Sequence, residues 1–156
     1  MAAEMAGCPL PSPWKDFLTE IDSQLREPLE LHCIGGFALV FFYGLPRTTG
    51  DIDYYTAIPS NLDLEELAGE NSALHEKYKV FLHRVAVVSL PEEYASRLSE
   101  MAMGEFKHLK LLVPDPDDYI LSKLQRGGSL KKILLCWNGC SGATFLMRQK
   151  ILSKAR

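Results

Sequence analysis

The chain has 156 residues, a net charge of −3, and hydrophobic and charged fractions of 47% and 24%. A chain of this length and composition is expected to fold as one domain with its own hydrophobic core. No apolar run reaches the roughly 20 residues of a transmembrane helix, and residues 1–12 lack the charged-then-apolar pattern of a signal peptide. The four cysteines are too scattered to predict a disulfide framework. We therefore expect a cytoplasmic protein without a membrane partner.

Charge is distributed unevenly along the chain. Residues 1–128 hold all 20 acidic residues and 11 of the 17 basic ones, whereas residues 129–156 hold six basic residues and no acidic one. This shift separates a basic C-terminal segment from a domain that we expect over residues 12–128. Residues 1–11 end in Pro-Leu-Pro and are expected to be a flexible N-terminus.

The first half of the chain predicts two helices and two strands. Ser12 and Pro13 have the residue types of an N-cap and a first helical position, and apolar residues then recur at helical spacing until about residue 25. Residues 29–34 read as a short strand that leads into a Gly-Gly turn. Residues 37–43 are apolar on every side, which indicates a buried helix, and a second strand begins at residue 51.

The second half continues the alternation of helices and strands. A helix is expected from residues 59–61 onward, followed by a strand over residues 80–88. Pro91 is expected to open a further helix that extends to Met101. Residues 106–113 then predict a strand, and residues 115–126 a helix with an acidic cap. This order predicts an α/β or α+β fold, in which a mixed β-sheet is flanked by helices.

Two carboxylates on the second strand are the strongest functional signal from the residues themselves. Asp51 and Asp53 are two positions apart, so in a strand their side chains point to the same face while Ile52 points into the core. Adjacent carboxylates repel each other, and a cation between them removes the repulsion. Oxygen ligands suit Mg²⁺ or Mn²⁺. The alternatives are a solvated strand end, or a turn acid that caps the loop at residues 48–50.

The Gly-Gly turn is a second candidate element of the site. Gly35 and Gly36 lie between a strand and a helix, where backbone N–H groups can bind a phosphate. The alternative interpretation is an ordinary strand-to-helix turn that requires a positive φ angle.

Together these residues carry a family resemblance. Residues 35–53 read GGFALVFFYGLPRTTGDID, which resembles the signature GG-x-A, a helix, and then G-x-x-R-x-T-x-DID of the nucleotidyltransferase (DNA polymerase β-like) superfamily. The resemblance is closest to the small bacterial members associated with toxin–antitoxin systems. Residues 112–126, LVPDPDDYILSKLQR, are similar to the proline, acidic, L-S-K-L-x-R helix of the same members.

The resemblance implies a nucleotidyltransferase fold and a chemistry. Asp51 and Asp53 would be catalytic and would hold Mg²⁺ or Mn²⁺ on a nucleoside triphosphate, whose nucleoside monophosphate is transferred to a hydroxyl of an RNA, a protein or a small molecule. It also implies a cognate antitoxin-like partner. The phosphates would be bound by Gly35, Gly36, Arg47, Thr49 and Lys123.

For three of these residues a structural role stays open beside phosphate binding. Arg47 can form an ion pair with Asp51 or Asp53 instead. Thr49 can bond to the same carboxylates and hold the loop without a ligand. Lys123 can be a solvated surface cation.

One feature of the superfamily is missing from the pattern. Its enzymes have a third acid on a later strand, but residues 80–88 contain no Asp or Glu, and Ala86 stands where that acid is expected. A catalytically inactive binding module that acts through a protein or nucleic-acid partner is therefore the alternative function. The four histidines show no metal-ligand spacing, so each is expected to be satisfied or exposed rather than a ligand: His32, His75, His83 and His108.

The basic segment 129–156 has three interpretations. Its cations can neutralise the phosphates of a nucleic acid or contact an acidic partner. It can also be a helix that only covers the sheet. Finally, relatives of residues 112–126 continue with acidic residues that this chain lacks, so the segment can be the product of an altered reading frame.

Overall fold

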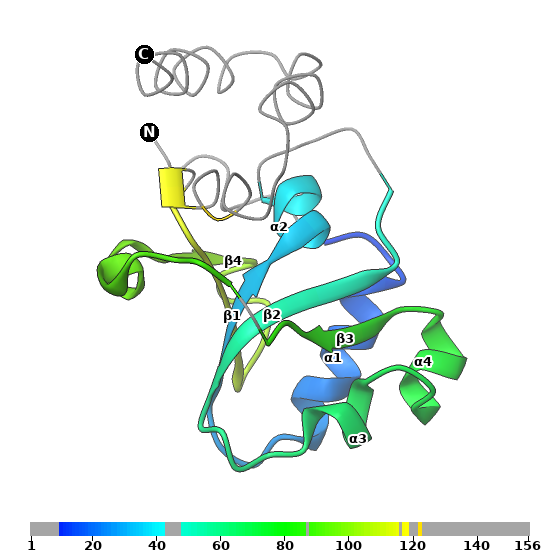
Figure 1. The fold of residues 1–156 in the computed structure, drawn as a ribbon. Coiled ribbons are helices and arrows are strands. Elements are labelled where there is room, and N and C mark those ends of the chain that lie inside the picture. Colours follow the sequence, from blue (N-terminus) through cyan, green and yellow to red (C-terminus); the bar gives the residue numbers. More distant parts are fainter. Residues whose placement is uncertain (1–9, 43–47, 87, 116, 119–121, 123–156) are drawn as a thin grey trace.

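The computed structural model describes residues 10–42, 48–86, 88–115, 117–118 and 122. These residues form one mixed sheet with the strand order β3-β2-β1-β5-β4 (Figure 1). The strands are β1 (Leu29–Ile34), β2 (Asp51–Ile58), β3 (Phe81–Arg84), β4 (Ser99–Met101) and β5 (Leu109–Val113). The helices are α1 (Trp14–Gln24), α2 (Gly35–Phe41), α3 (Leu64–Ala68) and α4 (Ala73–Tyr78), with the 3₁₀ helix η2 (Glu92–Arg97).

Both strand orientations occur in the sheet. The central strand β1 is antiparallel to β2 and parallel to β5, while β2 is parallel to β3 and β4 is antiparallel to β5. Parallel strands need a long connection, and helices α3 and α4 provide it between β2 and β3. The predicted α+β class with a mixed sheet is thus confirmed.

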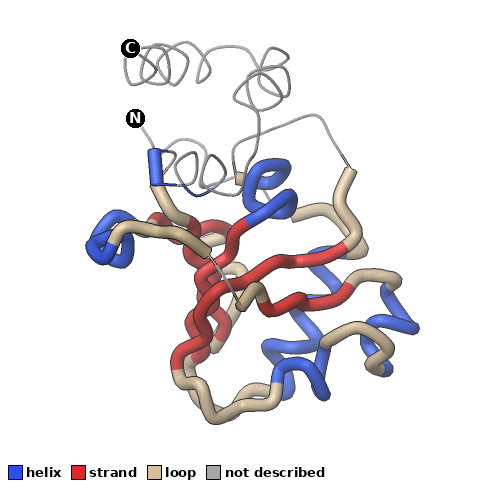
Figure 2. The backbone as a smooth tube through the Cα atoms, in the orientation of Figure 1, coloured by secondary structure: helices blue, strands red, loops and turns tan. Residues whose placement is uncertain are grey.

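Helices α1, α3 and α4 lie together on one face of the sheet (Figures 1 and 2). The apolar residues of α1 recur at three- and four-residue spacing, which puts them on the side of the helix that faces the strands. Inward side chains of the strands complete a core of fully buried residues, among them Phe17, Leu18, Ile21, Leu31, Ile52 and Leu111. None of the helices in the described part of the chain has the length and hydropathy needed to span a membrane.

Helix α2 continues directly from β1 and packs on the start of α1. The ring centroid of Trp14 lies 5.3 Å from that of Phe37 and 5.4 Å from that of Phe41. These tilted aromatic contacts bury α2 on its apolar side. The prediction of a short buried helix is confirmed, although it begins at Gly35, so both glycines lie in its first turn.

The start of α1 differs from the prediction. Pro13 occupies the N-cap position, and no side chain caps the helix there. The Ser12 hydroxyl instead donates to the Asp16 carboxylate at 2.7 Å. The N-cap prediction for Ser12 was wrong because the helix begins one residue later, with Pro13 at the N-cap position.

The helices after β2 also begin elsewhere. Helix α3 starts after Asp63, whose carboxylate accepts the backbone N–H of Glu66 at 2.9 Å. The predicted start at residues 59–61 was wrong because Asp63 supplies a cap that satisfies a free N–H group of the first turn. Helix α4 was not predicted. It is capped by Ser72 and ends at Lys79 in the left-handed conformation.

The region after Pro91 forms less helix than expected. A 3₁₀ helix covers Glu92–Arg97 and ends at Leu98 with extended backbone. Met101, which was assigned to this helix, lies in β4 opposite Leu111. Strand pairing, a tertiary effect, overrides the local helical pattern here.

The last predicted strand and helix are only partly described. Strand β5 buries Leu109, Leu111 and Val113 on one face, as predicted. Asp115 accepts the backbone N–H of Asp117 at 2.9 Å, which agrees with an acidic cap. Most of the predicted helix over residues 115–126, and the whole of the basic segment 129–156, lies outside the described residues.

A single carboxylate on α1 anchors the approach to β5. Asp22 accepts the backbone N–H groups of Lys107, His108 and Leu109 at 3.0, 2.7 and 2.8 Å. Burial raises the pKa of Asp22, but the three N–H donors outweigh burial and hold the pKa below its ordinary value. The charged carboxylate therefore stabilises the native fold.

We expect Asp22→Ala to lower the free energy of unfolding by about 1–3 kcal/mol at neutral pH, because three N–H groups lose their acceptor. Chemical denaturation measures this difference. Since the folded-state pKa is depressed, the stabilisation is fully present above the unfolded pKa and disappears as the pH falls through the folded one. A loss that is unchanged at pH 2 would contradict this origin. Asp16→Ala on the same helix is the control, with an expected change of about 0.5 kcal/mol or less.

Candidate functional site

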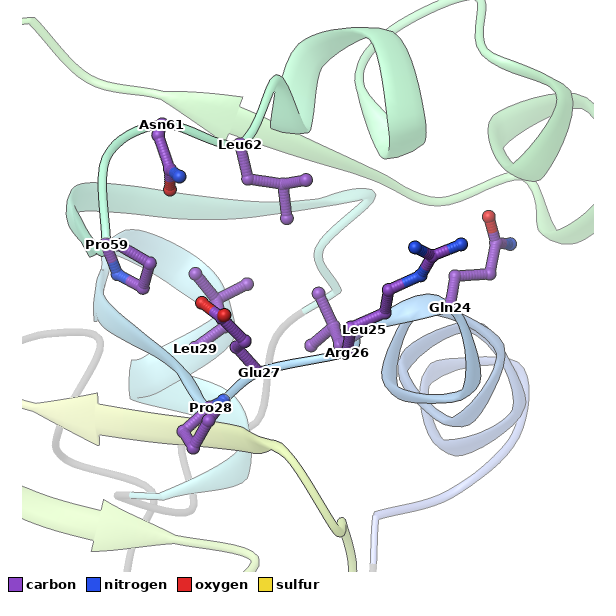
Figure 3. Close-up of a pocket in the computed structure, with 9 residues that line it drawn as sticks. All are labelled: Gln24, Leu25, Arg26, Glu27, Pro28, Leu29, Pro59, Asn61 and Leu62. Carbon is purple, nitrogen blue, oxygen red and sulfur yellow. The ribbon is translucent and has the colours of Figure 1, made fainter.

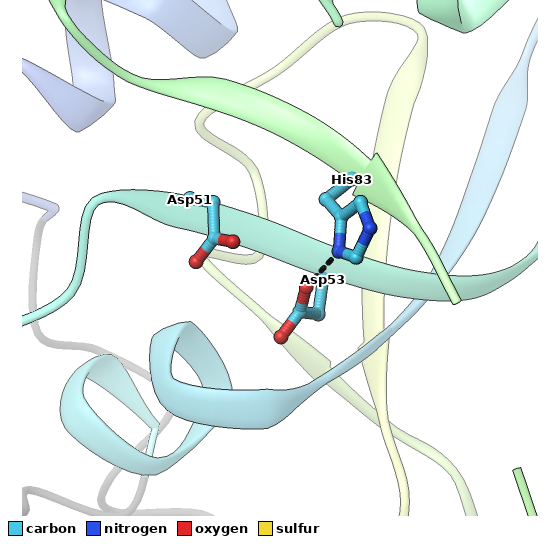
Figure 4. A group of neighbouring side chains, drawn as sticks. All are labelled: Asp51, Asp53 and His83. Carbon is cyan, nitrogen blue, oxygen red and sulfur yellow. Dashed lines mark hydrogen bonds and ion pairs between the residues drawn. The ribbon is translucent and has the colours of Figure 1, made fainter. Parts of the chain in front are cut away.

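Asp51 and Asp53 lie on the same side of β2, as the alternation of the strand predicts. Both side chains are partly exposed, whereas Ile52 between them is fully buried in the core. Figure 4 shows the two carboxylates side by side along the strand. The predicted pair of acidic side chains on one face of a strand is therefore present.

A histidine from the neighbouring strand completes the group. The parallel pairing of β3 with β2 places His83 opposite Asp53, and His83 Nδ1 lies 2.8 Å from Asp53 Oδ1 (Figure 4). One ligand atom each of Asp51, Asp53 and His83 lies within 4.8 Å of the others. Among the described residues, this group of candidate metal ligands contains two carboxylates, one imidazole and no third acid.

The structure also shows what the sequence pattern missed. His83 is hydrogen-bonded and its side chain is 57% exposed, which agrees with the expectation of a satisfied or exposed histidine. Its position beside both carboxylates was not predicted. Ala86 was expected opposite the acidic pair, but β3 ends at Arg84 and the residue in register with Asp53 is His83. Strand register, which no local spacing reports, decides this position.

The two glycines allow the turn to approach β2 closely. Gly35 has a φ angle of +78°, and a Cβ atom on it would collide with Asp53 Oδ2. A Cβ atom on Gly36 would lie 3.2 Å from Thr49 Oγ1. The expectation of a positive φ angle is confirmed at Gly35 but not at Gly36. Gly35 thus gives Asp53 the space that it occupies.

Thr49 holds the start of β2. Its hydroxyl donates to the main-chain carbonyl of Asp51 at 3.2 Å. The hypothesis that Thr49 bonds to the acidic side chains is therefore corrected, because the hydroxyl bonds to the backbone instead. Arg47 and Lys123, the two predicted phosphate-binding cations, lie outside the described residues.

Comparison with known protein families assigns the chain to one of them. A family model described as nucleotidyltransferase of unknown function (DUF6036) matches residues 15–130. The chain belongs to this family. The match includes Asp51, Asp53 and His83, so the whole group lies inside the nucleotidyltransferase-like region. Searches of curated proteins and of solved structures gave no match.

Electrostatics make the site of this nucleotidyltransferase-like protein receptive to a cation. Burial, and then the neighbouring charge of Asp53, raise the pKa of Asp51, while His83 opposes this rise. The raised pKa means that the charged form of Asp51 is held at a free-energy cost, which comes first from burial and then from the charge of Asp53. A bound divalent cation would remove that cost. The donor set of two carboxylates and an imidazole fits such an ion.

A buried thiol lies on β1, next to the strand that carries the acidic pair. Cys33 is fully buried in β1, and burial, followed by the charge of Asp53, raises its pKa to about 12. A thiol with this pKa remains protonated at neutral pH and is a poor nucleophile. Cys33 is therefore not counted among the candidate functional residues, which are the two carboxylates and the imidazole.

An open pocket lies at the other end of β2. It has a volume of about 400 Å³ and lies between the end of α1 and the β2–α3 connection (Figure 3). Its lining residues are Gln24, Leu25, Arg26, Glu27, Pro28, Leu29, Pro59, Asn61 and Leu62. None of them belongs to the group around Asp53, so this pocket is separate from the candidate metal-binding residues.

Proposed function

We propose that this chain is a metal-dependent nucleotidyltransferase that binds a nucleoside triphosphate with Mg²⁺ or Mn²⁺. The reaction transfers a nucleoside monophosphate to a hydroxyl of an RNA, a protein or a small molecule. The observation that carries this proposal is the pair Asp51 and Asp53 on one face of β2, with Asp53 against Gly35. Membership of the nucleotidyltransferase family supports it.

The acidic pair is the proposed metal-binding element. When bound, a divalent cation neutralises phosphate charge and lowers the pKa of an attacking hydroxyl. Asp51 and Asp53 would hold it, because their oxygen donors match the preference of both ions. Asp53 is held in place at both of its oxygens, since Gly35 lies against Oδ2 and His83 lies at Oδ1.

The remaining predicted residues would bind and orient the triphosphate. Gly35 and Gly36 present backbone without side chains next to Asp53 and Thr49, and their N–H groups are the proposed phosphate donors. Thr49 keeps the start of β2 in place through the carbonyl of Asp51. Arg47 and Lys123 are proposed as further phosphate contacts on the basis of the sequence resemblance. Positioning and electrostatics of this kind supply most of the catalysis in such reactions.

The proposed reaction is a displacement at the α-phosphorus. The acceptor oxygen forms a bond to this phosphorus, the bond to the oxygen that bridges to the β-phosphate breaks, and pyrophosphate leaves. The proton of the hydroxyl is lost to water.

Thermal denaturation with each of the four nucleoside triphosphates and a divalent cation tests the binding step. A ligand at 100 times its Kd stabilises the native state by about 2.7 kcal/mol, which corresponds to a rise in Tm of roughly 5–10 °C for a chain of this size. We expect the rise in the wild type and not in Asp51→Ala/Asp53→Ala. The control is Glu65→Ala/Glu66→Ala, which removes two acids from α3. Identical behaviour of the wild type and the aspartate variant with all four nucleotides would contradict the proposal.

One observation favours a second function. The place beside Asp53 is filled by an imidazole and not by the third carboxylate expected of an active superfamily member. The alternative is therefore an inactive binding module that acts through a protein, such as an antitoxin-like partner, or through a nucleic acid. Incubation with α-labelled nucleotides and candidate acceptors separates the two. Label transfer that requires Asp53 supports the enzyme, whereas nucleotide binding without transfer supports the module.

A further inference from the structure

The position of His83 is fixed by backbone pairing and not only by its side chain. Strand β3 pairs with β2 from Phe81 to Arg84, and the pairing continues past the histidine, because Val85 N–H donates to Tyr54 O at 2.9 Å. A change of register by one residue would turn His83 to the other face of the sheet. The sheet therefore holds an imidazole at the acidic pair.

The partner of His83 is also held in place. Asp53 lies between two neighbours, with Oδ2 against Gly35 and Oδ1 at 2.8 Å from His83 Nδ1. Its side chain is only 24% exposed, while that of His83 is 57% exposed. The carboxylate thus has little freedom to move, whereas the imidazole faces the solvent from which an ion would arrive.

We propose that His83 is a third metal ligand, and that it makes the site prefer a first-row transition cation, represented by Mn²⁺, over Mg²⁺. This inference rests on the proposed metal binding by Asp51 and Asp53. Mg²⁺ favours oxygen ligands and keeps several of its waters. Imidazole nitrogen favours transition metals, and Mn²⁺ also accepts carboxylates. A site with only carboxylates would accept both Mg²⁺ and Mn²⁺. A site with two carboxylates and one imidazole therefore favours Mn²⁺.

The competing role for His83 makes the opposite prediction. If the imidazole only neutralises Asp53, it competes with any cation for the carboxylate, and its removal strengthens the binding of both ions. If it is a ligand, its removal weakens Mn²⁺ binding and has little effect on Mg²⁺. The sign of the change in affinity distinguishes the two roles.

Titration calorimetry of the full chain with Mn²⁺ or Mg²⁺, without nucleotide, measures this change. We expect His83→Ala to weaken Mn²⁺ binding by about 10–100-fold, the range typical of residues that support a metal site, with a much smaller effect on Mg²⁺. His83→Asp is expected to bring the two affinities at least about tenfold closer together, because it restores an oxygen donor. His108→Ala is the matched control, since His108 precedes β5, two strands from β2 in the sheet, and should change neither affinity.

Electron paramagnetic resonance of bound Mn²⁺ is measured on the wild type, so it does not require any variant to fold. Hyperfine coupling to ¹⁴N is expected in the wild type and is absent if only oxygen atoms bind the ion. Bound Mn²⁺ without nitrogen coupling, or tighter binding of both ions by His83→Ala, would overturn the inference and leave the proposed function standing. Failure of both ions to bind the wild type, together with no response to nucleotides, would overturn both.

Discussion

Asp53→Asn is expected to lower the rate of nucleotidyl transfer by at least about 100-fold, within the range seen when one charge-stabilising group is removed from an active site. Asp53 is the side chain at which the turn, the acidic pair and the imidazole meet, with Gly35 on one oxygen and His83 on the other. The substitution keeps the shape of the side chain and removes its charge. Initial rates of label transfer from an α-labelled nucleotide measure the effect.

This variant separates catalysis from folding. The asparagine side chain would still fit against Gly35, and the loss of one of two repelling charges should leave the free energy of unfolding unchanged or slightly higher. The control is Glu66→Gln, which neutralises an exposed acid in the first turn of α3 and should leave the rate unchanged. A rate for Asp53→Asn within about threefold of the wild type would exclude Asp53 from the chemistry, since one charge-stabilising group is expected to contribute far more.

Gly35→Ala is expected to lower the free energy of unfolding by more than the roughly 1–3 kcal/mol that is typical of an unfavourable backbone conformation alone. The φ angle of +78° disfavours any side chain, and the new Cβ would also collide with Asp53 Oδ2. Chemical denaturation at neutral pH measures the change. Gly50→Ala is the matched control, because a Cβ atom on Gly50 meets nothing within 4 Å.

A double-mutant cycle divides this loss into its two causes. In an Asp53→Ala background the carboxylate is gone, so the cost of Gly35→Ala should fall to that of the backbone conformation alone. The difference between the cost of Gly35→Ala in the wild type and its cost in Asp53→Ala measures how tightly the turn packs against Asp53. If Gly35→Ala is tolerated as well as Gly50→Ala, the turn does not constrain Asp53 as the structure indicates.

Local patterns were sufficient to predict the central part of the sheet. The strand over residues 29–34, the buried helix after it and the inward face of β5 follow from their apolar patterns, and the Gly-Gly pair marks the end of the first of them. The acidic pair was predictable for the same reason, since alternation along one strand requires no information from elsewhere in the chain. In these elements the local sequence preference and the final structure agree.

What the sequence did not reveal depends on contacts between distant segments. His83 reaches Asp53 across 30 residues of chain, and only the β2–β3 register brings them together. Likewise, Met101 fits a helical pattern but pairs with Leu111 in the sheet. The capping residues were mistaken at α1 and α3 because each helix begins later than the local pattern indicates, after Pro13 and after Asp63.

The parallel pairing of β3 with β2 has a consequence for how the domain is held together. In the described sheet β3 is one of the two edge strands, and helices α3 and α4 connect it to its neighbour β2. An ion bound by Asp51, Asp53 and His83 would act as a crosslink between this strand and its neighbour, closing a 30-residue loop. Part of its binding free energy would then become folding free energy. Chelation should therefore loosen β3, α3 and α4 first, and their amide hydrogens should exchange faster while those of β1 remain protected.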